Sequence, residues 1–175
     1  GGARRVDADA RYGNCCERKP GSEQGMTPAG QLVRAFGDVD RMAGLYAPDI
    51  CWSLSASLVM YPRPMQGRDA VIAFNRHVWS DVYQPDCHVE ILDETGDAGL
   101  SAVRFLYSAI LIADGRRYEN EYTLFARSGP RGITHVFEGL DTAALLDFVG
   151  GRMAGASFEQ TGASRHETRR QRQPD

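Results

Sequence analysis

Apolar residues recur at helical spacing after residue 25. The clearest stripe, at positions i, i+3, i+4 and i+7, consists of Val39, Met42, Ala43 and Tyr46. Asp38 precedes the stripe, where its carboxylate can cap the first turn of a helix. The pattern predicts a helix that begins after Asp38, faces the core with this stripe and ends at Pro48.

Other elements are predicted on either side of this helix. They are a short helix at 27–36, a strand at 50–57, a Pro-rich loop at 61–64 and a helix at 68–79. Val71, Phe74 and Val78 share one side of the last helix. The first half of the chain is therefore predicted to be mainly helical.

Beyond Pro85 the apolar period changes from 3.6 to 2, which is typical of strands. The predicted strands lie at 87–93, 100–113, 117–127 and 132–140. Asp114-Gly115 is a strong hairpin signal, and 128–131, which contains Gly-Pro, makes another turn. Asp141 can cap a last helix at 142–149 that ends at Gly150-Gly151. Helices followed by a sheet indicate an α+β fold.

The two ends of the chain have compositions that do not build a core. Residues 1–25 lack an initiating Met and an apolar period, and are interpreted as a disordered leader, with Met26 as a plausible start. The pair Arg4-Arg5 is not followed by an apolar stretch, which disfavours twin-arginine export. Residues 151–175 are interpreted as a disordered polar tail, so the predicted domain spans 26–150.

Composition narrows the class of protein. A chain of 175 residues supports one compact core, and its net charge of -3, with both signs mixed, disfavours nucleic acid and anionic lipid as partners. The longest apolar stretch, at 105–113, is shorter than the roughly 20 residues that cross a bilayer. The four cysteines have no zinc-type spacing, which favours a reducing, cytoplasmic setting.

Motifs for metals and cofactors are missing from the sequence. The four histidines are scattered, and there is no Gly-rich phosphate loop, nucleophile-elbow motif or recognisable Cys-His spacing. The sequence therefore predicts no metal and cofactor-free chemistry.

Counting across the two hairpins predicts which residues share a face of the sheet. An even loop centred on Gly129-Pro130 places Glu121 opposite Glu138, and the turn at Asp114-Gly115 places Ser108 opposite Glu121. The face with the glutamates is then formed by Arg104, Leu106, Ser108, Ile110, Glu121, Thr123, Val136, Glu138 and Leu140. The other face is formed by Phe105, Tyr107, Ala109, Leu111, Tyr122, Leu124, His135 and Phe137. Both are too apolar to face water, so we predict a homodimer.

Two carboxylates opposite each other in a sheet repel, so the predicted Glu121–Glu138 pair needs a functional or structural explanation. In an apolar cavity, desolvation and repulsion raise one pKa from about 4.3 towards neutrality and provide a general acid or base. The alternatives are that both glutamates face solvent, or that Arg104 or Arg76 neutralises them.

The order of several motifs resembles the SnoaL-like branch of the nuclear transport factor 2-like superfamily. The motifs are 37–49 (GDVDRMAGLYAPD), 67–70 (GRDA), 118–122 (YENEY), 133–141 and 143–145. The resemblance covers nearly all of residues 26–150. It implies a cone in which a curved, mixed, largely antiparallel sheet wraps three to four helices and encloses an apolar pocket, with dimers formed through the outer sheet face. It does not choose between cyclases, isomerases, epoxide hydrolases, dehydratases and binding domains.

Two functional residues of the family have counterparts in this sequence, and several others do not. Glu138 stands three places before Asp141, as an acidic residue does in related cyclases and hydrolases, and Glu121 is similar in position to an oxyanion-hole acid of ketosteroid isomerases. The isomerase base is replaced here by Leu54 or Ser53, and its first-helix Tyr has no counterpart. The Arg of epoxide hydrolases, two places before Glu121, is also missing.

The remaining candidates line the predicted cavity. The expected substrate-binding residues are Trp52, Leu54, Tyr46, Phe74, Arg104, Ser108, Thr123, Val136, His77 and His88. Trp52 offers a stacking surface, although a core role fits it equally. His77 and His88 are possible proton carriers or simply exposed, and His135 is predicted to be structural.

The sequence supports a leading hypothesis and two alternatives. In the first, Glu138 is the general acid or base of a small-molecule enzyme acting on an apolar carbonyl compound, and a protonated Glu121 stabilises the enolate. In the second, the cavity binds a small apolar ligand or a partner without chemistry. In the third, the domain is a dimeric scaffold whose interior is filled by side chains.

Overall fold

The computed structural model describes residues 26–58 and 64–153. The predicted leader at 1–25, nearly all of the predicted tail and most of the Pro-rich loop lie outside the described residues. None of the described helices is long and apolar enough to span a bilayer.

Four α-helices and one π-helical turn are described. They are α1 (Pro28–Val33), α2 (Val39–Leu45), α3 (Arg68–His77), η2 (Val78–Val82) and α4 (Thr142–Met153). Asp38 Oδ1 accepts a hydrogen bond from the Arg41 amide at 3.0 Å, which confirms the predicted cap of α2. Asp141 Oδ1 caps α4 through the amides of Ala143 and Ala144, and this helix runs past the predicted stop at Gly150-Gly151.

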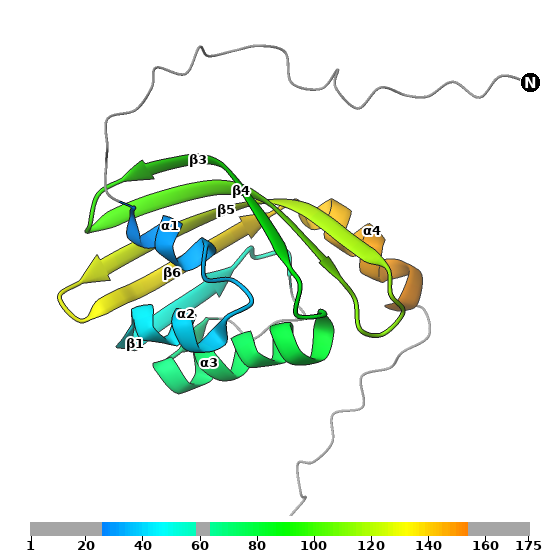
Figure 1. Cartoon of the computed structure of the whole chain (residues 1–175), viewed down its shortest axis with the longest axis horizontal. Helices are drawn as coiled ribbons and strands as arrows, with labels where there is room; N and C mark the ends of the chain where they lie inside the picture. Colours follow the sequence, from blue (N-terminus) through cyan, green and yellow to red (C-terminus); the bar gives the residue numbers. More distant parts are fainter. Residues whose placement is uncertain (1–25, 59–63, 154–175) are drawn as a thin grey trace, which may run out of the picture.

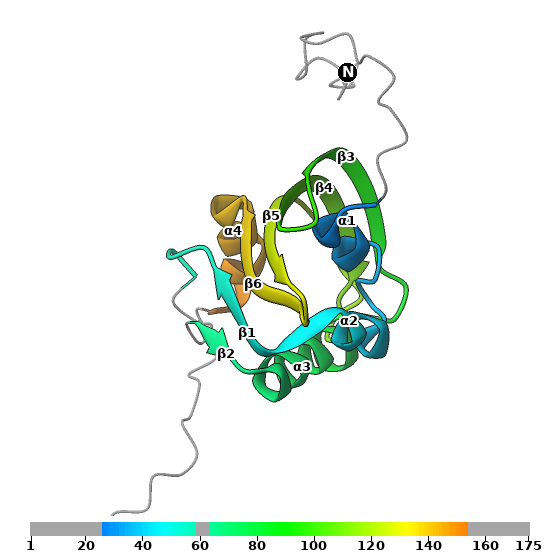
Figure 2. The ribbon, with the colours of Figure 1, turned by 90° about the vertical axis from the view of Figure 1, so that its left-hand side faces the viewer.

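Six strands form one mixed sheet. They are β1 (Tyr46–Leu54), β2 (Met65–Gln66), β3 (His88–Gly96), β4 (Leu100–Ile110), β5 (Arg117–Gly129) and β6 (Gly132–Leu140). Their order is β2-β1-β6-β5-β4-β3, and all neighbours are antiparallel except β1 and β6. The chain is an α+β fold in which the curved sheet wraps around α1, α2 and α3 (Figures 1 and 2).

The elements differ from the predicted ones mainly around β1. Tyr46 begins this strand instead of continuing α2, because its backbone pairs with Ile133 of β6. Pairing with a distant strand thus overrides the local helical stripe. The two-residue strand β2 was not predicted.

The core lies between the concave face of the sheet and the helices. Its largest fully buried side chains include Trp52, Tyr118, Phe105, Leu32, Met42, Ile50 and Leu124. Alternate residues of β4 and β5 point into this core, as the period-2 pattern predicts. The concave face therefore holds both the core and the walls of the pocket described next.

Candidate active site

Glu121 and Glu138 lie on opposite faces of the sheet. Glu138 pairs with Leu124, not with Glu121, and it belongs to the concave face. Glu121 lies on the outer face, where its Oε1 accepts a hydrogen bond from Arg104 Nη1 at 3.0 Å. Arg104 also donates to Asp93 Oδ2 at 2.8 Å. The predicted glutamate pair, and with it the predicted enolate-stabilising role of Glu121, is therefore wrong.

A β-bulge explains the error. The β5–β6 turn is centred on Pro130-Arg131 and not on Gly129-Pro130, so each residue of β5 would pair with a residue of β6 two positions further along than predicted. This even shift alone would keep the predicted faces. However, Ser128 pairs with Ile133 and Arg127 pairs with His135, so Thr134 is an extra residue in β6. One extra residue reverses the face of every side chain that follows it in the count.

The β4–β5 pairing also differs from the prediction, but without changing faces. Ser108 pairs with Glu119, and Leu106 pairs with Glu121, which is a shift by two positions. The reason is that the loop is centred on Ala113-Asp114 and not on Asp114-Gly115, because the last strand pair is Ile110 with Arg117. Since the shift is even, Arg104, Ser108 and Thr123 remain on the face of Glu121.

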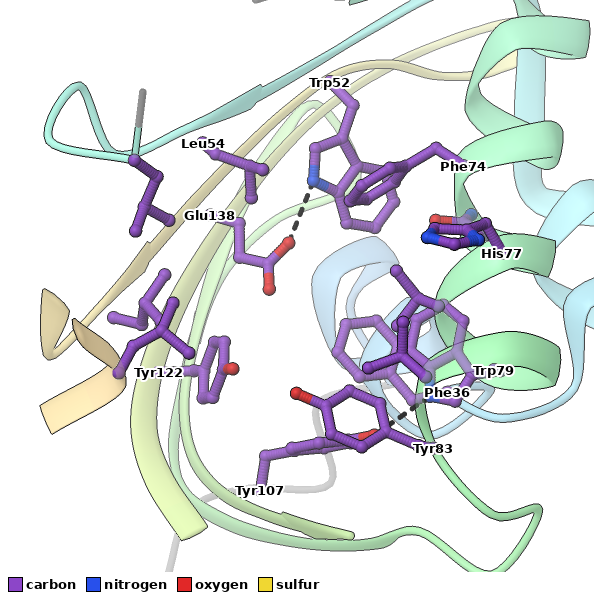
Figure 3. Close-up of a pocket in the computed structure, with 16 residues that line it drawn as sticks. Phe36, Trp52, Leu54, Phe74, His77, Trp79, Tyr83, Tyr107, Tyr122 and Glu138 are labelled. Carbon is purple, nitrogen blue, oxygen red and sulfur yellow. Dashed lines mark hydrogen bonds between the residues drawn. The ribbon is translucent and has the colours of Figure 1, made fainter. Parts of the chain in front are cut away.

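One apolar pocket opens on the concave face around Glu138 (Figure 3). It has a cavity volume of about 120 Å³. The residues that line it are Phe36, Trp52, Leu54, Leu58, Phe74, Asn75, His77, Val78, Trp79, Val82, Tyr83, Tyr107, Tyr122, Glu138, Leu140 and Leu145. An apolar chamber with a few converging polar groups is the usual form of a small-molecule site.

Glu138 directs its carboxyl group into this chamber (Figure 3). Its Oε2 accepts a hydrogen bond from Trp52 Nε1 at 3.0 Å. Burial raises the pKa of Glu138 to about 7, and the hydrogen bond from Trp52 opposes this shift by stabilising the carboxylate. Because the indole N–H occupies Oε2, the proton of the neutral acid resides on Oε1. Glu138 can thus give or take a proton near neutral pH on the oxygen that Trp52 does not hold.

Two phenols of the wall belong to hydrogen-bond chains. Trp79 Nε1 donates to the Tyr107 hydroxyl at 3.1 Å, and the hydroxyls of Tyr118 and Tyr122 lie 2.9 Å apart. Burial raises the pKa of Tyr107 and Tyr122 above the usual range, and the charge of Glu138 contributes in the same direction. Both phenols therefore stay protonated at neutral pH and can donate hydrogen bonds.

His77 lies on the helical wall of the pocket, across from Glu138 (Figure 3). Its Nδ1 is 2.9 Å from Asp81 Oδ2, one turn further along the chain. More than half of each side chain is exposed, so this pair stands at the rim. Asn75, behind the same wall, donates from Nδ2 to the Tyr46 hydroxyl at 2.6 Å.

The structure gathers only part of the predicted site. Trp52, Leu54, Phe74, His77 and Glu138 line the pocket. Tyr46 and Val136 are buried in the core beside it. The residues predicted for the pocket that lie on the outer face of the sheet instead are Arg104, Ser108, Thr123 and His88.

Sequence reasoning missed most of the aromatic wall. Tyr107 and Tyr122 were assigned to the face opposite Glu138, because the bulge was not anticipated. Trp79 and Tyr83 come from the π-helical turn and the segment that follows it. Their signal was the pair of aromatic residues at the end of the third predicted helix and four residues beyond it. Within the described part of the chain, no group of three or more His, Cys, Asp or Glu side chains could hold a metal ion.

A curved sheet that wraps around helices, with a single acidic side chain among the described residues that line its apolar pocket, defines an α+β cone. The SnoaL-like domain model matches residues 32–132, so the chain belongs to the SnoaL-like domain family. No curated protein sequence matches this chain significantly.

Solved structures share the fold at low sequence identity. A nuclear transport factor 2-like protein of unknown function from Burkholderia pseudomallei is 19% identical, with a TM-score of 0.58 over 69% of this chain and 92% of its own. A protein of ketosteroid isomerase-like fold from Catenulispora acidiphila, solved with trimethylamine, is 14% identical, with a TM-score of 0.58 over 70% and 92%. A protein named as a candidate polyketide cyclase from Xanthomonas campestris is 17% identical, with a TM-score of 0.55 over 69% and 92%. These similarities establish the fold alone.

Proposed function

We propose that this chain is a small-molecule enzyme that uses Glu138 for cofactor-free general acid/base catalysis. Its substrate is an apolar carbonyl compound, and the reaction is of the cyclase, isomerase or dehydratase type. The observation that carries the proposal is the carboxyl group of Glu138 in an apolar pocket, with its pKa raised by burial to about 7. The name of the structural neighbour from Xanthomonas campestris fits this reaction class.

A hydrogen-bond chain supplies a partner for the substrate oxygen in place of Glu121. Asn120 Nδ2 donates to the carbonyl oxygen of Asp141 at 2.9 Å, which fixes the orientation of the amide because a carbonyl only accepts. The same Nδ2 also donates to the Tyr118 hydroxyl at 2.9 Å. The Tyr118 hydroxyl can therefore donate its own hydrogen bond to the Tyr122 hydroxyl. Tyr122 can then donate to a carbonyl oxygen in the chamber and stabilise the charge that develops when Glu138 removes a proton.

The test begins with mass spectrometry of the small molecules that the purified protein retains, followed by turnover assays on related carbonyl compounds. Glu138→Gln should abolish turnover, because the amide cannot exchange a proton, while the protein stays folded. Tyr122→Phe should lower kcat by about 100-fold with a smaller effect on KM, since the lost hydrogen bond strengthens in the transition state. Glu121→Gln is the matched control on the outer face. Unimpaired turnover by Glu138→Gln would refute the proposal.

The alternative is a non-catalytic domain that holds a small ligand in the same pocket. The complex of the Catenulispora acidiphila protein with trimethylamine is an example of a small molecule bound by a protein of this fold. Retention of a ligand that no variant and no condition converts would favour this alternative. The open pocket beside Glu138 disfavours the third hypothesis, a scaffold with a filled interior.

The domain is further proposed to act as a homodimer in the cytoplasm. Large apolar side chains remain exposed on the outer sheet face, which supports association with a second copy. Cys51 and Cys87 are free thiols, which is compatible with a reducing compartment.

A further inference from the structure

The pocket combines one acidic group with a wall of aromatic rings. The aromatic residues that line it are Phe36, Trp52, Phe74, Trp79, Tyr83, Tyr107 and Tyr122. The π-faces of such rings attract cations, and tryptophan does so most strongly. In Figure 3 the labelled rings surround the space into which the carboxyl group of Glu138 points.

Permanent positive charge is lacking among the described residues of this wall. Among the described residues that line the pocket there is no Arg or Lys. The other carboxylates with charged partners, such as Glu94 with Arg34 and Glu121 with Arg104, form their ion pairs elsewhere in the molecule. Within the described ranges Glu138 takes part in none of the ion pairs, and its hydrogen-bond donor is the neutral Trp52 indole. An anionic ligand would meet repulsion without compensation.

The groups around Glu138 that titrate are neutral or already paired. His77 of α3 is the one lining residue that can carry a positive charge, and Asp81 holds it at the rim. Tyr107 on β4 and Tyr122 on β5 keep their protons, because burial raises the pKa of each phenol. Tyr46, at the start of β1, is also near the charge of Glu138 and stays neutral for the same reason.

We infer that the pocket selects a compact ammonium group, so that the otherwise apolar carbonyl substrate carries a small tertiary or quaternary amine. The cavity of about 120 Å³ is close to the size that accepts one benzene ring, roughly 150 Å³. A trimethylammonium group is smaller than that ring. The inference rests on the proposed function in one respect, namely that this pocket is the ligand site. It concerns binding of the ligand, whether or not turnover follows.

Such a ligand also fits the proposed chemistry. A cation beside Glu138 stabilises its carboxylate and lowers the pKa of the group, which keeps it ionised as a base at neutral pH. Binding of the cation must therefore release a proton when Glu138 starts out protonated. The affinity for a cation should rise with pH through about 7 and level off above it, because the ionised form is the one that attracts the ligand.

The test compares choline with 3,3-dimethylbutan-1-ol, its uncharged isostere, on the full chain. The only two tryptophans of the sequence, Trp52 and Trp79, both line the pocket, so intrinsic fluorescence reports its occupancy directly. At about pH 8.5 choline should bind roughly tenfold more tightly than the alcohol, and at about pH 5.5 this preference should shrink to the smaller one that the aromatic rings alone provide.

Two variants separate the pocket charge from the overall charge of the protein. Glu138→Gln should reduce the preference for choline at about pH 8.5 to the value expected at about pH 5.5, with a smaller effect on binding of the alcohol. Glu121→Gln removes an equal charge from the outer face and should keep the preference. Equal affinity for the two probes at high pH, no response to choline, or a preference that is undiminished in Glu138→Gln would each overturn the inference. A failure of this kind leaves the acid/base proposal standing, since turnover of an uncharged substrate tests that proposal separately.

Discussion

Glu138 is unfavourable for stability for the same reason that it suits proton transfer. Its carboxyl group has left water for an apolar pocket, and one indole N–H replaces the lost solvent. This exchange stabilises the neutral acid relative to the carboxylate, which is the cause of the raised pKa. The folded state therefore holds a proton that the unfolded chain releases at lower pH.

Removing this carboxyl group should stabilise the protein in alkaline but not in acidic solution. The pKa of Glu138 rises from 4.5 to about 7 on folding, so the folded state binds more protons than the unfolded state between these values. Stability is lost as the pH rises through this window. Glu138→Gln avoids the loss and should raise the free energy of unfolding by up to about 3 kcal/mol at pH 8.5, with little change at pH 4.

Urea denaturation of both proteins across the pH range measures this difference. Glu121→Gln provides the comparison, because that residue lies at the outer face beside Arg104. A stability difference between wild type and Glu138→Gln that does not vary with pH would contradict the assignment of a buried, raised-pKa carboxyl group.

At the level of elements, the sequence correctly predicted the helix starts and strands that depend on neighbouring residues alone. The capping aspartates Asp38 and Asp141 define helix starts because each acts on amides within its own first turn. The strands of the second half followed from alternation, which survives small errors in their ends. The family resemblance pointed to Glu138 as a candidate without any knowledge of its neighbours, and the residue does line the pocket.

What the sequence could not reveal is the bulge at Thr134, on which the composition of the pocket depends. Thr134 has the β-branched side chain of an ordinary strand residue. The bulge is instead tied to distant backbone, because β6 pairs with β1 on one side and β5 on the other. Gly132 has a φ of +112° and approaches the carbonyl oxygen of Leu45 so closely that a Cβ atom would lie 2.6 Å away. Such a contact between residues 87 positions apart has no local signature.

Deleting Thr134 should remove the bulge without changing the faces of β6. Its neighbours Ile133 and His135 pair with the consecutive residues Ser128 and Arg127, so the shortened strand can continue as a regular ladder with the same residues inward and outward. The cost is local repacking of β6 against β1, and we expect a loss of about 1 to 3 kcal/mol in the free energy of unfolding. Thr134→Ala keeps the bulge and loses the 3.3 Å hydrogen bond of the hydroxyl to the Arg127 carbonyl oxygen and its 3.2 Å contact with His135 Nδ1, for a cost of about 1 kcal/mol or less. Chemical denaturation compares the two variants, and a deletion variant that does not fold would contradict this assignment of the extra residue.

For the whole molecule, the bulge that brings Glu138 inwards also turns Phe137 outwards. Phe137 and Phe125 are each 45% exposed, and their ring centroids are 6.5 Å apart on the outer face. Leu106 and Leu100 add exposed apolar surface on the same side of β4. A patch of this kind is unfavourable in water and can be covered by the same patch of a second copy, since a twofold axis brings identical surfaces together.

Phe137→Asp should therefore convert a dimer into a monomer. In a twofold interface each substitution introduces two carboxylates, one from each copy, that must be buried near each other in place of two apolar rings. The expected result is a halved molar mass in light scattering at micromolar concentration, with the concave pocket and its tryptophan fluorescence retained. Leu146→Asp is the matched control, because Leu146 is similarly exposed but belongs to α4 rather than to the sheet. A wild-type protein that is already monomeric, or an equal effect of both substitutions, would show that this face does not hold two copies together.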